Sequence, residues 1–215
     1  EHAGRTGGLP FVGVGWYRLN FEAPAFSSGK KATLIFDGAM SHARVYINGQ
    51  EAGFWPYGYN SFHIDATPYL KAGEQNTLAV RLENETESSR WYPGAGLYRN
   101  VHLVINEDPH IPTWGTQLTT PVVKKDFARV NLKTRLDIPS GKAFTDYRIV
   151  TELKAPDGKV VASDEQQGTK YDEKIFNQHF VVDNPALWSP DSPALYSAVS
   201  KVYEGNTLKD EYTTP

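Results

Sequence analysis

Hydrophobic and polar residues alternate with a period of two along many short stretches of this chain. In segment 42–47, three apolar residues alternate with His42, Arg44 and Tyr46. Segment 128–136 repeats the pattern, with Ala, Val, Leu, Thr and Leu on one face and polar residues on the other. Because successive side chains of a strand point to opposite faces, this pattern predicts half-buried β-strands.

The strands expected on this basis are short, and turn residues separate them. Asn48-Gly49 is a strong hairpin signal, because a type I′ turn needs positive φ at both central residues. Pro156-Asp157-Gly158 and Gly205 mark further turns. Many short strands with little sign of a long helix predict an all-β chain built from sandwiches or barrels. The expected strands span residues 16–21, 32–36, 42–47, 51–55, 77–82, 101–105, 128–136, 147–153, 159–162, 176–182, 199–203 and 208–212.

A polar cluster that ends in proline, residues 106–109, interrupts this pattern near the middle of the chain. Domain boundaries commonly fall in such polar, proline-containing segments. We therefore expect two domains, residues 1–108 and residues 109–215. Residues 1–12 are glycine-rich and are expected to form an irregular loop that enters the first strand.

Composition and charge exclude several kinds of function for this chain. The 215 residues are 40% apolar and 22% charged, which is typical of a folded globular chain, and the net charge is −3. A nucleic-acid partner is not expected, since it would need a basic stripe. No run approaches the roughly 18 apolar residues of a membrane span. The chain has no cysteine, which excludes disulfides and thiolate metal sites. It begins with Glu1 instead of Met, so it looks trimmed; a lost export signal would indicate a periplasmic or secreted protein, but the compartment stays open.

The sequence gives little evidence for a catalytic or metal-binding site. The histidines lack a metal-ligand spacing such as HExxH, and structural or surface roles are expected for them. No cofactor is expected, because Gly13-Val14-Gly15 is not followed by the strand–helix context of a dinucleotide loop. The carboxylates resemble solvated loop or strand-edge groups, and no acid/base pair is expected among them. These carboxylates are Glu83, Glu85, Glu87, Asp164 and Glu165.

The segment 88–99 presents the strongest candidate binding residue. It begins with Ser88-Ser89, passes through Arg90, Trp91 and Tyr92, and turns at residues 93–96, Pro-Gly-Ala-Gly. The loop is therefore held between two strands, an arrangement that commonly presents binding residues. An unpaired guanidinium is costly to bury, so Arg90 is expected either in an ion pair with Glu83, Glu85 or Glu87, or in a ligand pocket.

Several motifs, taken in order, resemble glycoside hydrolase family 2, the family of β-galactosidases, β-glucuronidases and β-mannosidases. They include GWYR at 15–18, FDG at 36–38, VYING at 45–49 and NTLAVR at 76–81. The run that contains Arg90 resembles a further signature of the family. PALWSP at 185–190 with Leu195-Tyr196 is similar to the family's immunoglobulin-like domain. The resemblance covers nearly the whole chain.

The resemblance implies an all-β fold: a jelly-roll, galactose-binding-like sandwich that lacks its opening strand, followed by an immunoglobulin-like β-sandwich. Family members cleave glycosidic bonds with two glutamates of a (β/α)8 barrel that follows these domains. Such a barrel takes about 250 residues and is not among these 215. The resemblance therefore implies a non-catalytic N-terminal fragment, most similar to β-galactosidases, that braces the barrel. Arg90 would contact a β-galactoside or related carbohydrate in the intact enzyme.

Three alternatives stay open at the level of sequence. Phe11 and Val12 stand where some long bacterial β-galactosidases have a polar active-site residue, so a β-glucuronidase or β-mannosidase relative is also compatible. A free-standing carbohydrate-binding module would require an exposed aromatic platform, for which residues 55–57, Trp-Pro-Tyr, are the candidate. The third alternative is a structural scaffold without ligand contact.

Overall fold

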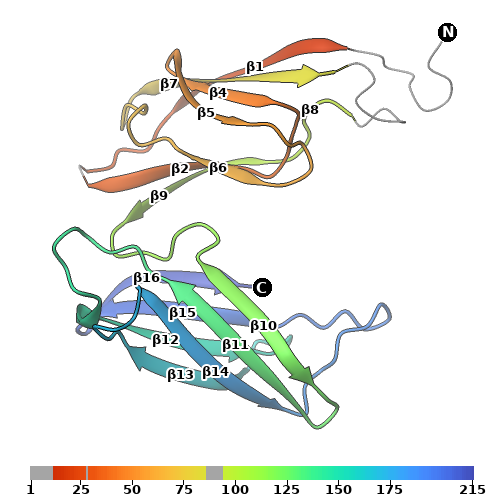
Figure 1. The fold of residues 1–215 in the computed structure, drawn as a ribbon, viewed down its shortest axis with the longest axis vertical. Coiled ribbons are helices and arrows are strands. Elements are labelled where there is room, and N and C mark those ends of the chain that lie inside the picture. Colours follow the sequence, from red (N-terminus) through yellow and green to blue (C-terminus); the bar gives the residue numbers. More distant parts are fainter. Residues whose placement is uncertain (1–11, 28, 86–93) are drawn as a thin grey trace. The chain divides into compact units, whose positions relative to one another are not determined.

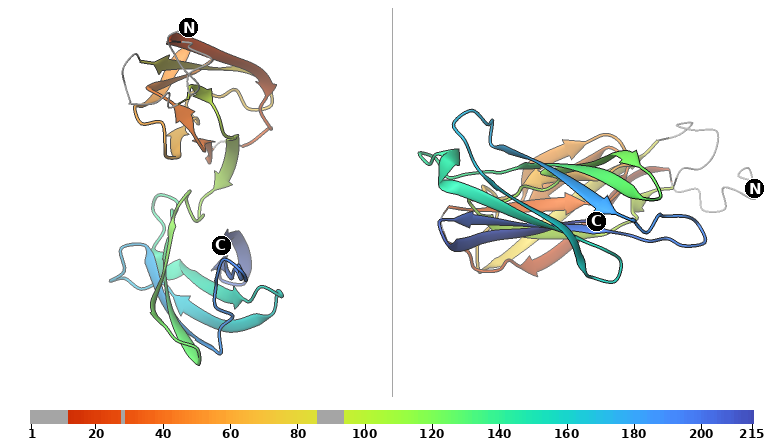
Figure 2. Two further views of the ribbon diagram at one scale, coloured as in Figure 1. Left: turned by 90° about the vertical axis from the view of Figure 1, so that its right-hand side faces the viewer. Right: turned by 90° about the horizontal axis from the view of Figure 1, so that it is seen from below.

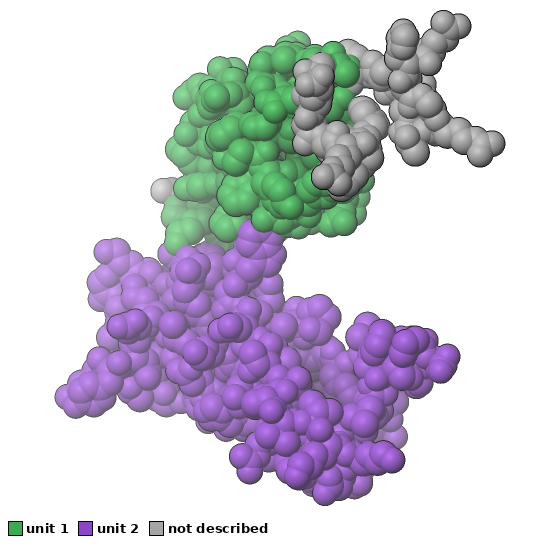
Figure 3. Space-filling view, turned by 45° about the vertical axis from the view of Figure 1, so that its right-hand side comes forward, with its two compact units in different colours: residues 1–107 green, residues 108–215 purple. Residues whose placement is uncertain are grey.

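The computed structural model describes residues 12–27, 29–85 and 94–215, and these residues form β-structure almost throughout (Figure 1). They contain no α-helix, only a single 3-10 turn at Phe144–Asp146. Within the same residues, no helix is long and apolar enough to cross a membrane. The chain divides into two compact units, residues 1–107 and residues 108–215, which Figure 3 colours separately.

The first unit is a sandwich of two antiparallel sheets. One sheet has the order β1-β7-β4-β5 and the other the order β6-β2-β9, and a short β3–β8 pair lies beside them. Figure 1 shows the two sheets as separate layers of this unit. The strands are β1 (Gly13–Glu22), β2 (Lys30–Phe36), β3 (Ala39–Met40), β4 (Ala43–Ile47), β5 (Gln50–Trp55), β6 (Phe62–Asp65), β7 (Gln75–Asn84), β8 (Gly96–Leu97) and β9 (Val101–Glu107).

The core of the first unit consists of the apolar residues that alternate inward from both sheets. Strand β4 is the clearest case, since every second residue of its sequence is fully buried. The turn after it confirms the hairpin prediction, with φ of 51° at Asn48 and 83° at Gly49. The buried cluster also includes residues of β2, β6 and β7: Ala32, Leu34, Phe36, Phe62, Ile64, Leu78, Val80 and Leu82.

The second unit is also a two-layer sandwich, with a sheet of order β10-β11-β14 facing one of order β13-β12-β15-β16. Figures 1 and 2 show the two layers of this unit. The predicted fold class, a jelly roll followed by an immunoglobulin-like sandwich, is confirmed. The strands are β10 (Thr116–Val123), β11 (Phe127–Arg135), β12 (Tyr147–Lys154), β13 (Val160–Gln167), β14 (Ile175–Asp183), β15 (Ser197–Glu204) and β16 (Thr207–Thr214).

A layer of polar side chains divides the core of the second unit into two apolar clusters. The layer consists of Thr134, Thr151, Gln178 and Ser200, all with no exposed surface. On each of the four strands the polar residue lies between a residue of one cluster and a residue of the other. The Thr151 hydroxyl donates to Oε1 of Gln178 at 2.6 Å and lies 2.9 Å from the Ser200 hydroxyl. These hydrogen bonds offset the cost of burying Thr151, Gln178 and Ser200, whereas the hydroxyl of Thr134 has no partner among the described residues.

Candidate functional site

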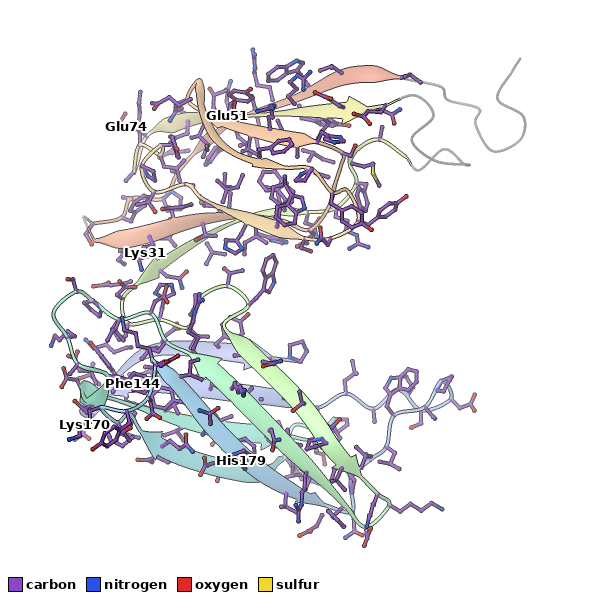
Figure 4. All side chains as sticks on the ribbon, viewed as in Figure 1. Lys31, Glu51, Glu74, Phe144, Lys170 and His179 are labelled. Carbon is purple, nitrogen blue, oxygen red and sulfur yellow. The ribbon has the colours of Figure 1, made fainter. Side chains whose placement is uncertain are left out.

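The predicted binding residue, Arg90, lies outside the described residues, as do Trp91 and Tyr92. The structure therefore describes the two chain ends that flank this segment, and not the segment itself. These ends are the end of β7 with Glu85 on one side, and residues 94–97 on the other. Figure 4 shows the described side chains of both units.

The end of β7 is hydrogen-bonded to the turn that precedes β4. The backbone N–H of Glu83 donates to the carbonyl of Ser41 at 2.9 Å. The hydroxyl of Ser41 donates in return to the carbonyl of Glu83, also at 2.9 Å. Sequence reasoning missed Ser41, because a serine that bonds to the backbone of a distant strand leaves no local pattern.

The other flank of the segment is held by close packing around two glycines. A side chain on Gly58 would overlap the Met40 side chain, and a side chain on Gly96 would overlap the hydroxyl of Tyr17. The Tyr98 hydroxyl donates to the carbonyl of Gly58 at 2.7 Å. The described residues on both sides of positions 86–93 are therefore held by contacts within the first unit.

A histidine and two glutamates gather at the end of β7. His42, Glu83 and Glu85 each place one possible ligand atom within 4.8 Å of the others. Arg81 already forms an ion pair with Glu83, and this hydrogen bond holds the pKa of the Glu83 carboxyl below its usual value. His42 lies 3.9 Å from Glu85 through Nδ1. With a cation already supplied by Arg81, the arrangement is that of an ion-paired cluster.

Glu83 departs from its predicted surroundings. It was expected in a loop or at a strand edge, but it lies within β7, an inner strand of its sheet, and its side chain is 33% exposed. Asp164 and Glu165 do lie on an edge strand, β13, and Glu165 is 3.4 Å from Arg148. Among the described carboxylates of these two groups, Glu83, Glu85 and Glu165 each lie beside a basic side chain.

The other histidines with a described partner have structural contacts. His102 is 3.1 Å from Asp37, His110 is 2.9 Å from Asp108, and His179 is 2.8 Å from Asn131. Each of these side chains bonds to a neighbour within its own unit.

The candidate aromatic platform at residues 55–57 is only partly exposed. Trp55 stacks on Phe62 at 5.7 Å between ring centroids, and its Nε1 donates to Asn60. Tyr57 is 56% exposed and lies 5.6 Å from the ring of Tyr59. The exposed aromatic pair is therefore formed by Tyr57 and Tyr59, while Trp55 belongs to the packing of the sandwich.

Two family models match the chain in tandem. The model described as "Glycosyl hydrolases family 2, sugar binding domain" matches residues 10–107. The model described as "Glycosyl hydrolases family 2" matches residues 110–215. Together the two models cover nearly the whole chain.

Similar proteins include a β-galactosidase of Bacteroides ovatus, 40% identical over 99% of this chain and 25% of that protein. A β-glucuronidase of Formosa agariphila is 29% identical over 94% of this chain and 23% of its own length. Among solved structures, a glycosyl hydrolase family 2 member from Bacteroides cellulosilyticus has a TM-score of 0.85 at 33% identity, over 95% of this chain and 28% of that one. The chain thus spans about a quarter of the length of these relatives.

Proposed function

Because this chain belongs to family 2 of the glycosyl hydrolases, we propose that it is the non-catalytic N-terminal part of a β-galactosidase-like glycoside hydrolase. The tandem match of the two family models, over about a quarter of the length of the relatives, carries this proposal. The two units brace a catalytic (β/α)8 barrel elsewhere in the same polypeptide. That barrel, which needs about 250 residues, supplies the two glutamates of the reaction.

The segment with Arg90 forms one edge of the sugar pocket in this proposal. A guanidinium offers forked hydrogen-bond donors at fixed geometry, which suits pairs of sugar hydroxyls. Two carboxylates that could pair with Arg90 already lie beside other basic groups, Glu83 beside Arg81 and Glu85 beside His42. The assignment of Arg90 to sugar contact rests on the family resemblance.

An apolar groove opens on one side of the first unit, and it supports the expectation that a further strand packs there. The groove has a volume of about 370 Å³ and lies between β1 and β9, with Tyr17, Leu19 and Leu103 among its lining residues. Strand β9 is an edge of its sheet. An added strand beside β9 would cover these apolar side chains and pair the free edge.

The substrate we propose is a β-galactoside, following the similarity to the β-galactosidase of Bacteroides ovatus. A β-glucuronide is the second candidate, because β-glucuronidases of Formosa agariphila and Bacteroides uniformis are similar over the same part of the chain. A β-mannoside completes the set that the family resemblance implies.

Nitrophenyl glycosides of the three sugars test the proposal. The 215-residue chain should hydrolyse none of them, and the full-length enzyme should hydrolyse one. Turnover by the short chain that persists through repurification would contradict its non-catalytic role. A full-length enzyme that is inactive on all three substrates would contradict the glycosidase assignment.

A further inference from the structure

The outer face of the four-stranded sheet carries aromatic and arginine side chains in a single row. The strand register places Trp16 opposite Arg81, Arg81 opposite Arg44, and Arg44 opposite Phe54. Trp16 is 57% exposed and Phe54 is 45% exposed, and they stand on the two edge strands β1 and β5. Three strand spacings separate them, or about 14 Å. The GWYR segment thus directs Trp16 outward, while Tyr17 lines the groove on the inner side.

Hydrogen bonds and ring contacts within the face hold these side chains in place. Glu51, labelled in Figure 4, accepts from Arg44 at 2.9 Å and from the hydroxyl of Tyr46 at 3.3 Å. The Arg44 guanidinium lies 4.7 Å from the centre of the Phe54 ring. The ring of Trp16 lies 5.5 Å from that of Tyr46. The face is therefore ordered before any ligand arrives, which lowers the entropic cost of binding.

Two arginines lie directly opposite each other on neighbouring strands, an arrangement that does not stabilise a sheet. Like charges opposed across a strand pair are destabilising, and Arg44 and Arg81 are such a pair. Each has its own glutamate, Glu51 for Arg44 and Glu83 for Arg81, which reduces the repulsion. Locally unfavourable choices of this kind are concentrated at functional sites.

We propose that this face, defined by Trp16, Tyr46, Phe54, Arg44 and Arg81, binds an extended polysaccharide chain. Exposed aromatic rings stack on the apolar faces of sugar rings, and the guanidiniums and Glu51 between them bond to hydroxyl groups. A row of this length spans several sugar rings, so a polymer is favoured over a single sugar. The face would hold the substrate polymer near the enzyme, which rests on the proposed glycosidase function.

A protein partner is disfavoured by the order of the residues in the row. The centre of a protein–protein interface is depleted of charged groups, and its rim is polar. Here the two inner strands carry Arg44 and Arg81, each paired with its glutamate, beside Tyr46, while Trp16 and Phe54 stand on the two edge strands. This order places polar donors where sugar hydroxyls need them, between two aromatic ends.

Affinity gel electrophoresis with soluble β-1,4-galactan and with glucuronoxylan tests the proposal on the 215-residue chain. At least one polymer should retard the chain. Trp16→Ala should weaken binding by about tenfold or more, since it removes a stacked aromatic ring. The matched control is Trp188→Ala in the second unit, where Trp188 is 60% exposed; its binding should equal wild type. Retardation by neither polymer, or equal losses in the two variants, would overturn the proposal.

Arg44→Lys provides a second readout in case Trp16→Ala fails to fold. Lysine keeps the charge but loses the planar fork, so binding should fall while the melting temperature stays close to that of the wild type. Unchanged binding in this variant would also overturn the proposal. The full-length enzyme should bind the same polymer. If it does not, another part of the polypeptide covers this face, and the proposal is wrong for the intact protein. Binding is measured without catalysis, so this result is separable from the glycosidase assignment.

Discussion

Arg90 is the residue to which both the sequence and the family resemblance point, and the described structure is limited to its flanks. We predict that Arg90→Ala in the full-length enzyme lowers kcat/KM by roughly 10- to 100-fold, through loss of charge-assisted hydrogen bonds of about 1.5–3 kcal/mol. The melting temperature should change little. Steady-state kinetics measure the first effect and thermal unfolding the second.

The control for this prediction is Arg129→Ala, which removes an exposed arginine of β11 in the second unit. Its kinetics should match those of the wild type. Wild-type kinetics for Arg90→Ala would exclude the sugar-contact role. A large fall in its melting temperature would indicate a structural ion pair instead.

Tyr147 contrasts with Arg90, because the structure describes it fully although the sequence analysis did not single it out. Its side chain is fully buried, and its hydroxyl has no hydrogen-bond partner among the described residues. Burial raises the pKa of this phenol above its ordinary value of 10.0. We predict that Tyr147→Phe keeps or increases the free energy of unfolding at neutral pH, by up to about 1–3 kcal/mol, because an unsatisfied polar group is removed.

The raised pKa of Tyr147 also predicts that the free energy of unfolding depends on pH. The folded state holds the phenol proton more tightly than the unfolded chain does, so the unfolded chain loses its proton first as the pH rises above about 10. The free energy of unfolding should therefore fall with pH in that range, and Tyr147→Phe should reduce the fall. Urea unfolding of the wild type and of Tyr147→Phe, at neutral and at alkaline pH, measures this fall in the free energy of unfolding. Tyr171→Phe, at a residue 82% exposed, is the control and should behave as the wild type.

At the scale of strands, the polar layer of the second unit can be tested directly. We predict that Gln178→Leu lowers the free energy of unfolding by about 1–3 kcal/mol, because the Thr151 hydroxyl loses its acceptor in the core. The double variant Gln178→Leu with Thr151→Val should recover part of this loss, since no hydroxyl of Thr151 is then left buried. Urea unfolding of the wild type, the two single variants Gln178→Leu and Thr151→Val, and the double variant measures the coupling. Equal losses for the single and double variants would show that the hydrogen bond contributes little.

Strands were predictable from the sequence where one face is apolar and the turn is distinctive. Segment 42–47 and the Asn48-Gly49 turn meet both conditions, and the strand and turn are found as expected. Gln178 and Ser200 show the limit, since a polar residue in an alternating strand is normally assigned to the solvent face. Their burial depends on Thr151, which is 27 and 49 residues away. Local patterns do not contain such distant pairings.

The candidate site was less predictable than the fold for a related reason. The anchors of the Arg90 segment come from Ser41, Gly58 and Tyr17, which are remote from it in sequence. The outward row of Trp16, Arg81 and Arg44 requires the register of three strands. The alternation of 42–47 did place Arg44 and Tyr46 on one face, but not which residues of other strands lie beside them.

At the scale of the whole molecule, the two units should unfold as separate cooperative blocks. Each has its own apolar core, one centred on β2, β4 and β7 and the other divided by the polar layer. We predict two transitions in differential scanning calorimetry, of which Gln178→Leu lowers only one. A single transition that shifts as a whole in this variant would contradict the prediction.

The polar layer should also disfavour the exchange of strands between the two units during synthesis. Tandem β-domains on one chain are prone to exchange strands before either is complete. The buried polar side chains of the first unit, Asn76 and Asn84, lie near the two ends of β7, whereas four strands of the second unit each bring one polar group to the middle of its core. If a strand of the first unit were inserted into the second unit, its apolar side chains would pack against Gln178 and Ser200. The polar groups of these two residues would then be buried without hydrogen bonds, which is costly. The hydrogen bonds of the layer should therefore favour pairing within the second unit and disfavour a misassembled, aggregation-prone product.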